Sequence, residues 1–186
     1  MIVLRMGKTK VIFNFGFFLA LSLFCLIDTK GIAVCTFCSC IVHEIGHILA
    51  TVLVDMTIEK ISLGFGGIKM TPEKKIKSLG SDILILLSGP FFNAMSALCY
   101  YHFECYTAFS INLILAFFNL LPFSSLDGGL VIRKIIEYFQ LKTDFCMKLI
   151  VVISALAICG FLYICNVKNV FVYGIILFLC FSEFFY

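Results

Sequence analysis

Charged residues are scarce in this sequence. Asp, Glu, Lys and Arg make up 13% of its 186 residues, whereas 62% are apolar and 22 are Phe. Ordinary soluble domains carry about 25% charged residues, so the composition excludes a soluble enzyme or binding domain. At roughly 20 apolar residues per membrane helix, the chain has room for about six helices and little else. The net charge of +3 gives no indication of a nucleic-acid partner.

Two further features are missing. No small-residue cleavage site follows the first apolar run, so we expect a retained helix in place of a signal peptide. About six helices leave no stretch for a soluble regulatory domain. We therefore expect one integral-membrane domain over residues 1–186.

The apolar runs predict an all-α polytopic fold with about six transmembrane helices. When these helices alternate across a bilayer, all 14 basic residues except Lys30 and Lys168 fall on one side. Basic loops stay in the cytoplasm, so both termini should be cytoplasmic. The Phe-, Ile- and Lys-rich composition is typical of an AT-rich bacterial genome, so we expect a bacterial cytoplasmic membrane. The six helices are expected at Val11–Ile27, Gly31–Val54, Asp82–Tyr101, Thr107–Leu121, Phe145–Cys165 and Asn169–Tyr186.

Two connecting segments have patterns of their own. Ile61–Met70 has short apolar runs around glycines, which predicts either a membrane-edge β-hairpin or a flexible glycine loop. A hairpin there could add an extended substrate strand to its edge. Leu130–Leu141 carries its polar residues on one helical face, which predicts either an interfacial helix or a helix packed on the bundle.

Ten cysteines are scattered through the apolar runs. Free Cys in such runs behaves as a small hydrophobe, so we expect thiols and no disulfides. Cys35, Cys38 and Cys40 include a Cys-x-x-Cys spacing, which could also indicate a metal or redox site. We favour apolar filling, because a metal site needs further ligands and the same helix offers better ones.

The second predicted span contains His43-Glu44-Ile45-Gly46-His47. A helix places His43 and His47 one turn apart on one face, where both imidazoles can reach one ion. Glu44 follows the first histidine and can take a proton from a metal-activated water, then return it to a leaving amine. Ionisable residues within a span cost about 2.5 kcal/mol or more, so a functional site is favoured over a polar packing network.

Two histidines leave a catalytic zinc one protein ligand short. Asp127 is the best candidate for the third, because it follows the apolar stretch of the fourth span in Asn119-Leu-Leu-Pro-Phe-Ser-Ser-Leu-Asp-Gly-Gly129. Pro122 should end the helix, and Gly128 and Gly129 let the backbone turn and aim a carboxylate inward. The alternative is a solvated acid in a cytoplasmic loop.

These motifs resemble the site-2 protease family of intramembrane metalloproteases, peptidase family M50. That family carries His-Glu-x-x-His in one membrane helix and Asn-x-x-Pro followed by Leu-Asp-Gly in a later one, as at His43–His47 and Asn119–Gly128 here. The family's Ser-Gly-Pro-x-x-Asn pattern matches Ser88–Asn93. Within the family, the chain is most similar to the sporulation stage IV FB-type branch, which has six membrane helices and cytoplasmic termini.

The resemblance implies a zinc metalloprotease with one Zn²⁺ per chain. Its zinc ligands would be His43, His47 and Asp127, with Glu44 as the general base. Asn119 would hold the substrate or stabilise the oxyanion, with an interhelical hydrogen bond as the alternative. The expected reaction is hydrolysis of a peptide bond in or near a transmembrane segment of a membrane-tethered protein, with release of a transcription factor or regulator as one role.

The chain also departs from the family pattern. Many members have a second proline where this chain has Phe123-Ser124-Ser125, so the path of this loop can differ. The PDZ and nucleotide-sensing domains of other members are not expected here. Ser88, Gly89 and Asn93 are expected to serve close helix packing. The expected partners are the substrate and the lipid bilayer, and a homo-oligomer or a regulatory membrane partner is left open.

Two other function classes share part of this pattern. Intramembrane His and acidic residues also mark ion pathways, but a transporter would favour paired halves with matching broken helices. The single His-Glu-x-x-His without a counterpart argues against that class. The intact Glu44 argues against a catalytically inactive membrane scaffold.

Overall fold

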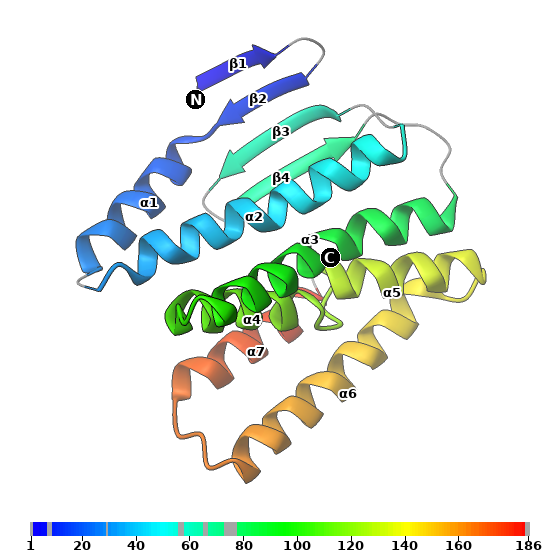
Figure 1. Ribbon diagram of the computed structural model, residues 1–186. Helices are drawn as coiled ribbons and strands as arrows, with labels where there is room; N and C mark the ends of the chain where they lie inside the picture. The colour runs from blue at the N-terminus through cyan, green and yellow to red at the C-terminus, as the bar shows by residue number, and fades with distance from the viewer. Residues whose placement is uncertain are drawn as a thin grey trace. The chain divides into compact units, whose positions relative to one another are not determined.

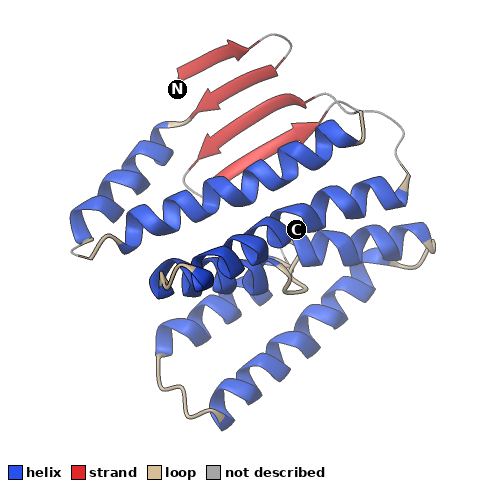
Figure 2. Cartoon of the chain, viewed as in Figure 1, coloured by secondary structure: helices blue, strands red, loops and turns tan. Residues whose placement is uncertain are grey.

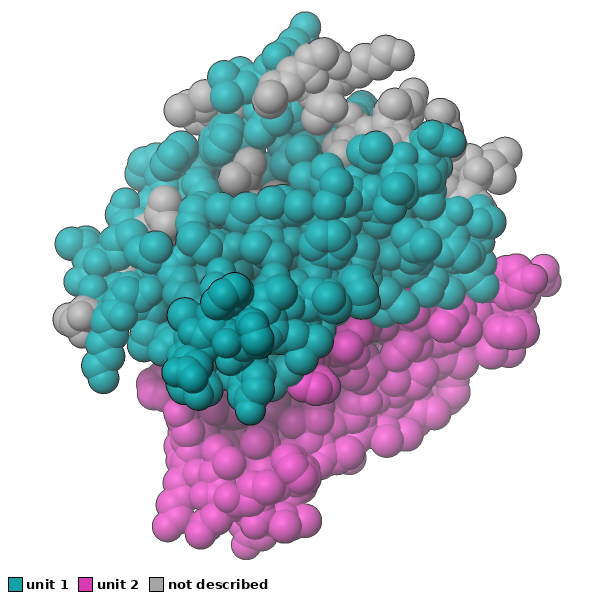
Figure 3. Space-filling model, in the orientation of Figure 1, with its two compact units in different colours: residues 1–116 teal, residues 117–186 magenta. Residues whose placement is uncertain are grey.

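The computed structural model describes residues 2–6, 9–28, 30–55, 58–64, 67–72 and 78–184. These residues form seven helices and four strands (Figures 1 and 2). The chain divides into two compact units, residues 1–116 and 117–186 (Figure 3). The single functional domain expected over residues 1–186 stays a prediction.

Unit 1 contains a four-stranded sheet made from two hairpins. The strand order is β1-β2-β3-β4, with β2 and β3 parallel and both outer pairs antiparallel (Figure 1). The predicted hairpin is confirmed as β3 and β4, although its turn at 65–66 lies outside the described residues. The strands are β1 (Ile2–Met6), β2 (Thr9–Phe13), β3 (Ile58–Gly64) and β4 (Gly67–Pro72).

The N-terminal hairpin corrects the start of the first predicted span. Hydropathy places Val11–Phe13 in a membrane helix, but these residues lie in β2 and pair with Ile61–Leu63 of β3. Apolar and β-branched residues suit a strand as well as a span. Hydropathy could not separate the two, because the partner strand lies far along the chain.

Two long helices of unit 1 pack closely against each other. They are α2 and α3, of 22 and 24 residues, which makes them about 33 and 36 Å long at 1.5 Å per residue. Both lengths exceed the roughly 30 Å of a bilayer's hydrocarbon core. The helices of this part of the chain are α1 (Phe15–Ile27), α2 (Ile32–Leu53), α3 (Leu79–His102) and α4 (Tyr106–Asn119), the last of which continues into unit 2.

Unit 2 consists of helices around a small apolar core. Its helices are α5 (Asp127–Tyr138), α6 (Thr143–Ile164) and α7 (Val170–Ser182). Phe123, from the loop before α5, is fully buried against Val151 of α6 and Ile176 of α7. The amphipathic helix predicted at 130–141 is confirmed in α5, and its contact with a membrane surface stays a prediction.

The six predicted spans are confirmed only in part. Within the described part of the chain, three helices are long and apolar enough to cross a membrane, namely α2, α3 and α6. The helices α1, α4 and α7 lie where spans were predicted but have only 13 to 14 residues. At about 20 Å each they are shorter than the hydrocarbon core. Hydropathy located these helices without showing where each one ends.

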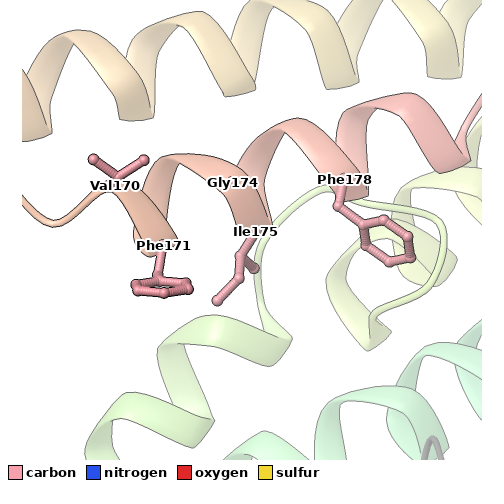
Figure 4. A pocket seen from close by; sticks show the side chains of 5 residues that line it. All are labelled: Val170, Phe171, Gly174, Ile175 and Phe178. Atoms are coloured by element: carbon pink, nitrogen blue, oxygen red, sulfur yellow. The ribbon is translucent and has the colours of Figure 1, made fainter.

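The outer faces of the helices carry large apolar side chains. Phe171, Tyr163 and Ile164 are each more than 80% exposed. Figure 4 shows Phe171, Ile175 and Phe178 projecting from α7 around Gly174, where they line an open apolar hollow. Such continuous apolar surface is costly in water, so the fold is that of a membrane protein.

Candidate metal centre

His43 and His47 lie one turn apart on the buried face of α2, as predicted. Their Nε2 atoms are 3.1 Å apart and their ring centroids are 4.7 Å apart. Each side chain is only 8% exposed. Two imidazoles that converge in an apolar helix pair form a site that the hydrophobic effect alone does not explain.

The second ring nitrogen of each histidine faces a hydrogen-bond acceptor on α3. His47 Nδ1 lies 2.7 Å from the main-chain carbonyl oxygen of Ile85, and His43 Nδ1 lies 2.7 Å from Oδ1 of Asn93. A carbonyl oxygen can only accept, so Nδ1 carries the proton and the Nε2 lone pair remains for coordination.

The two Nε2 lone pairs therefore face each other at 3.1 Å. Lone pairs at this separation repel each other unless a proton or a cation lies close to both. Metal-ligating histidines commonly donate their other N–H to a carbonyl or carboxylate, which fixes the ring and its tautomer. The donor set and its outer contacts thus fit a metal ion.

Two glycines allow α2 and α3 to approach at this point. A Cβ on Gly89 would lie 2.7 Å from His43 Nε2 and would overlap His47 Nε2. A Cβ on Gly46 would lie 2.7 Å from the main-chain oxygen of Ser88. Small residues at a helix crossing allow this close packing in membranes. Gly46 sets the helix spacing, and Gly89 leaves room for the imidazoles.

Asn93 has a more direct role than the packing role expected from the sequence. Its side chain is fully buried, and its oxygen accepts the hydrogen bond from His43. Its Nδ2 group donates to the Ser39 main-chain oxygen at 3.0 Å and to Oδ1 of Asn112 at 2.8 Å. Sequence reasoning missed Asn112 altogether. The available signal was an amide in an apolar span, which usually hydrogen-bonds across helices.

Glu44 lies on α2 directly after His43 and is half-buried. The carboxylate is thus attached to the same rigid helix as the two imidazoles. Its predicted role as general base stays a prediction, as does the role of Asn119, which is the half-buried last residue of α4.

Asp127 is the first residue of α5, in unit 2. It is half-buried, and the partial positive charge of a helix N-terminus favours a carboxylate at this position. Pro122 follows the end of α4 at Asn119, as predicted. His43 and His47, by contrast, belong to unit 1.

The glycines after Asp127 have a different purpose from the one predicted. Both lie in the first turn of α5, and neither has the positive φ of a sharp glycine turn. A Cβ on Gly128 would overlap the carbonyl of Leu120, and one on Gly129 would overlap the carbonyl of Phe123. The loop before α5 therefore passes directly against its first turn, and close approach requires the glycines.

The same loop is held by an acid that sequence reasoning missed. Glu183, at the end of α7, is 6% exposed. It accepts hydrogen bonds from the Ser124 hydroxyl at 2.8 Å and the Ser124 main-chain N–H at 3.3 Å. Ser124 lies in the stretch where many members of the resembled family have proline. Here hydrogen bonds to a buried carboxylate restrain the loop.

Comparisons with known proteins were made at the levels of sequence and structure. Residues 101–161 match the model of Peptidase family M50. The matched stretch includes Asn119 and Asp127 but not His43–His47, and it covers 61 of the 186 residues. No curated protein matches the chain.

Among solved structures, the chain is similar to the site-2 protease from Methanocaldococcus jannaschii. The TM-score is 0.63 at 21% sequence identity, over 98% of this chain and 93% of that one. At this level of identity the likeness establishes the fold that the two chains share.

Proposed function

We propose that this chain is an intramembrane zinc metalloprotease of the site-2 protease type. It hydrolyses a peptide bond in or near a transmembrane segment of a membrane-tethered protein. The observation that carries the proposal is the convergence of two buried imidazoles on α2, with each Nδ1 bonded to an acceptor on α3. The match to Peptidase family M50 and the shared fold support it.

The zinc ligands are His43 and His47 of α2 and Asp127 of α5. Each of these residues offers one ligand atom, two imidazole nitrogens and one carboxylate oxygen. Three protein ligands of this kind, with one position left open, are typical of catalytic zinc sites. A zinc ion at this site supplies a Lewis acid, which polarises a carbonyl and lowers the pKa of water to about 7.

Glu44 acts as the general base and then as the general acid. Its carboxylate takes a proton from the attacking water and delivers it to the nitrogen of the leaving amine. The placement of Glu44 beside His43 on one helix supports this role, because a rigid element holds both groups in a constant relation. Asn119, at the end of α4, would hold the substrate backbone or the oxyanion.

The substrate is expected to bind in an extended form. A transmembrane helix satisfies its own backbone, so the scissile carbonyl is reached only after local unwinding. In the described sheet, β3 is covered on both sides by β2 and β4, which leaves β4 as the outer edge of the predicted hairpin. An unwound segment could pair there as an added strand.

The finer biological assignments belong to the same proposal. They are six membrane helices, cytoplasmic termini, a bacterial cytoplasmic membrane, and a substrate such as a membrane-tethered transcription-factor precursor in sporulation. The basic residues that alternate to one side of the predicted spans support the orientation.

The test is cleavage of candidate membrane-tethered substrates by purified protein in detergent, with zinc content measured in the same samples. Wild type should cut, Glu44→Gln should retain zinc without cutting, and Asp127→Ala should lose both properties. Glu104→Gln is a matched control, because it removes the same charge from an exposed connection. Absence of zinc from wild type, or full cleavage by Glu44→Gln, would refute the protease and favour the transporter or the scaffold.

A further inference from the structure

A chain of buried hydrogen bonds extends from His43 of α2 through α3 to α4. It includes Asn93 of α3, Asn112 of α4 and Ser39 of α2, which are all at most 3% exposed. All four residues belong to unit 1. Because each amide has one accepting and one donating end, the direction of every bond can be followed from fixed main-chain acceptors.

Asn112 is anchored by its two N–H groups. Its Nδ2 donates to the main-chain oxygen of Ala108 at 2.9 Å and to the hydroxyl of Ser39 at 2.9 Å. The Ser39 hydroxyl accepts there because its own proton is donated to the Cys35 main-chain oxygen at 2.9 Å. Both donors of Asn112 are thereby committed, so the atom that faces Asn93 is the acceptor Oδ1.

Asn93 is oriented in turn by two acceptors. Its Nδ2 donates to Oδ1 of Asn112 at 2.8 Å and to the main-chain oxygen of Ser39 at 3.0 Å. The atom left to face His43 is therefore Oδ1, which can only accept. A flipped amide would place an N–H against the imidazole and carbonyl oxygens against each other, all in a fully buried site.

We propose that Asn112 is a positioning residue that acts through Asn93 to hold His43 in the tautomer with hydrogen on Nδ1. The inference rests on the proposed function, in which His43 Nε2 is a zinc ligand. Asn112 fixes Asn93, Asn93 fixes the imidazole proton, and Nε2 keeps its lone pair. His47 is held by a shorter arrangement, in which the Ser88 hydroxyl lies 3.5 Å from Nδ1 and donates to the Ile85 main-chain oxygen at 2.6 Å. Its Nδ1 faces the main-chain oxygen of Ile85 directly.

The decisive comparison is Asn112→Leu against Asn112→Asp. Both side chains have nearly the shape of Asn, and neither keeps the two N–H groups of Asn112. Asp as the neutral acid keeps an oxygen that accepts from Asn93 and an O–H that donates to the Ala108 main-chain oxygen, whereas Leu keeps neither. Loss of an outer-shell partner lowers metal affinity by roughly 10- to 100-fold. We expect Asn112→Leu to lower zinc affinity by about tenfold, because Asn93 still donates to the Ser39 main-chain oxygen. Asn112→Asp should lower zinc affinity by less than Asn112→Leu does.

The second measurement does not need zinc. The chain has 3 His, so ¹⁵N-histidine labelling of the metal-free protein gives a spectrum simple enough to assign. Wild type should show His43 with its proton on Nδ1, and Asn112→Leu should show a mixture of tautomers. Thr51→Val is the control, because Thr51 is fully buried and its hydroxyl donates to the His47 main-chain oxygen at 2.7 Å. It should change neither measurement.

Equal zinc affinity and an unchanged His43 tautomer in Asn112→Leu would overturn the inference. If Asn112→Leu does not fold, Ser39→Ala removes one acceptor of Asn112 and should lower zinc affinity in the same direction by less. An unchanged affinity and tautomer in Ser39→Ala would count against the chain of bonds. If wild type binds no zinc, the proposed function fails, while the tautomer spectrum still decides the role of Asn112.

Discussion

Substitution of Gly89 by Ala should disable the metal centre through a single methyl group. The added Cβ would lie 2.7 Å from His43 Nε2 and would overlap His47 Nε2, whereas ordinary contacts begin at 3.4 Å. To restore an ordinary contact with the added Cβ, the His43 ring has to move by about 0.7 Å, the difference between 3.4 and 2.7 Å, and the His47 ring has to move as well. Each ring is hydrogen-bonded through Nδ1 to an acceptor on α3 at 2.7 Å, and Gly89 belongs to the same helix. A shift of the rings away from the added Cβ therefore stretches those bonds or separates α2 from α3.

The expected magnitude follows from two effects. Overpacking of a filled interior costs about 1 to 3 kcal/mol, which lowers the thermal stability of the protein in detergent. Misplacement of a reacting group by about 1 Å can reduce a rate by about 100-fold. We therefore expect Gly89→Ala to bind zinc much more weakly than wild type and to cleave substrate about 100-fold more slowly.

The assay needs controls that separate helix spacing from the site itself. Gly160→Ala, in α6, adds a Cβ with nothing within 4 Å, so zinc and cleavage should stay at wild-type levels. For Gly46→Ala, the nearest atom that the added Cβ meets beyond its chain neighbours is the Ser88 main-chain oxygen, at 2.7 Å, so this variant should cost stability and reduce zinc binding less than Gly89→Ala. Wild-type zinc affinity in Gly89→Ala would refute the reasoning.

Three further predictions concern other parts of the fold. Glu183→Ala should destabilise the protein by about 1 to 3 kcal/mol in detergent unfolding, because the hydroxyl and N–H of the half-buried Ser124 lose their acceptor; equal stability would contradict this. Phe123→Ala should cost about 3 to 5 kcal/mol in the same assay, since the side chain is fully buried, and a loss under 1 kcal/mol would be inconsistent with that core. Desolvation raises the pKa of Asp28, but hydrogen bonds from main-chain N–H groups lower it, with that of Ala33 the largest of them. The net effect is a pKa below the ordinary value of 3.8. The Asp28 carboxylate accepts hydrogen bonds from the main-chain N–H groups of Ile32 at 3.0 Å and Ala33 at 2.8 Å, in the first turn of α2. The stability that this gives is present above the ordinary pKa of 3.8 and is lost as the pH falls through the lowered pKa, so Asp28→Ala should be less stable than wild type at neutral pH and converge with it in acid.

The sequence predicted the parts of the site that depend on local spacing. A four-residue separation in a helix suffices to place His43 and His47 on one face, and the structure confirms that geometry. The β3–β4 hairpin is one of the two structures that the glycines between short apolar runs predicted, and the structure decides for it over a flexible loop. Pro122 ends α4 for a local reason as well, since proline lacks the N–H that a continuing helix requires.

Features that depend on distant partners were not visible in the sequence. The strand character of Val11–Phe13 depends on pairing with β3, and a hydropathy window reads only the apolar content that strands and spans share. Glu183 belongs to a residue type that is almost never fully buried. Its burial depends on Ser124, which no local pattern connects with it.

Asn93 and Asn112 show why an outer shell is harder to read than the ligands. An amide in an apolar span predicts a hydrogen bond across helices, but not which end of the amide is used. That choice is made by the main-chain oxygens of Ala108 and Ser39. The first is fixed as soon as α4 forms, but the second belongs to α2 and meets Asn93 only once α2 and α3 have packed. The imidazoles of His43 and His47 are thus specified by a sequence motif, whereas the tautomer of His43 is specified by the tertiary structure around it.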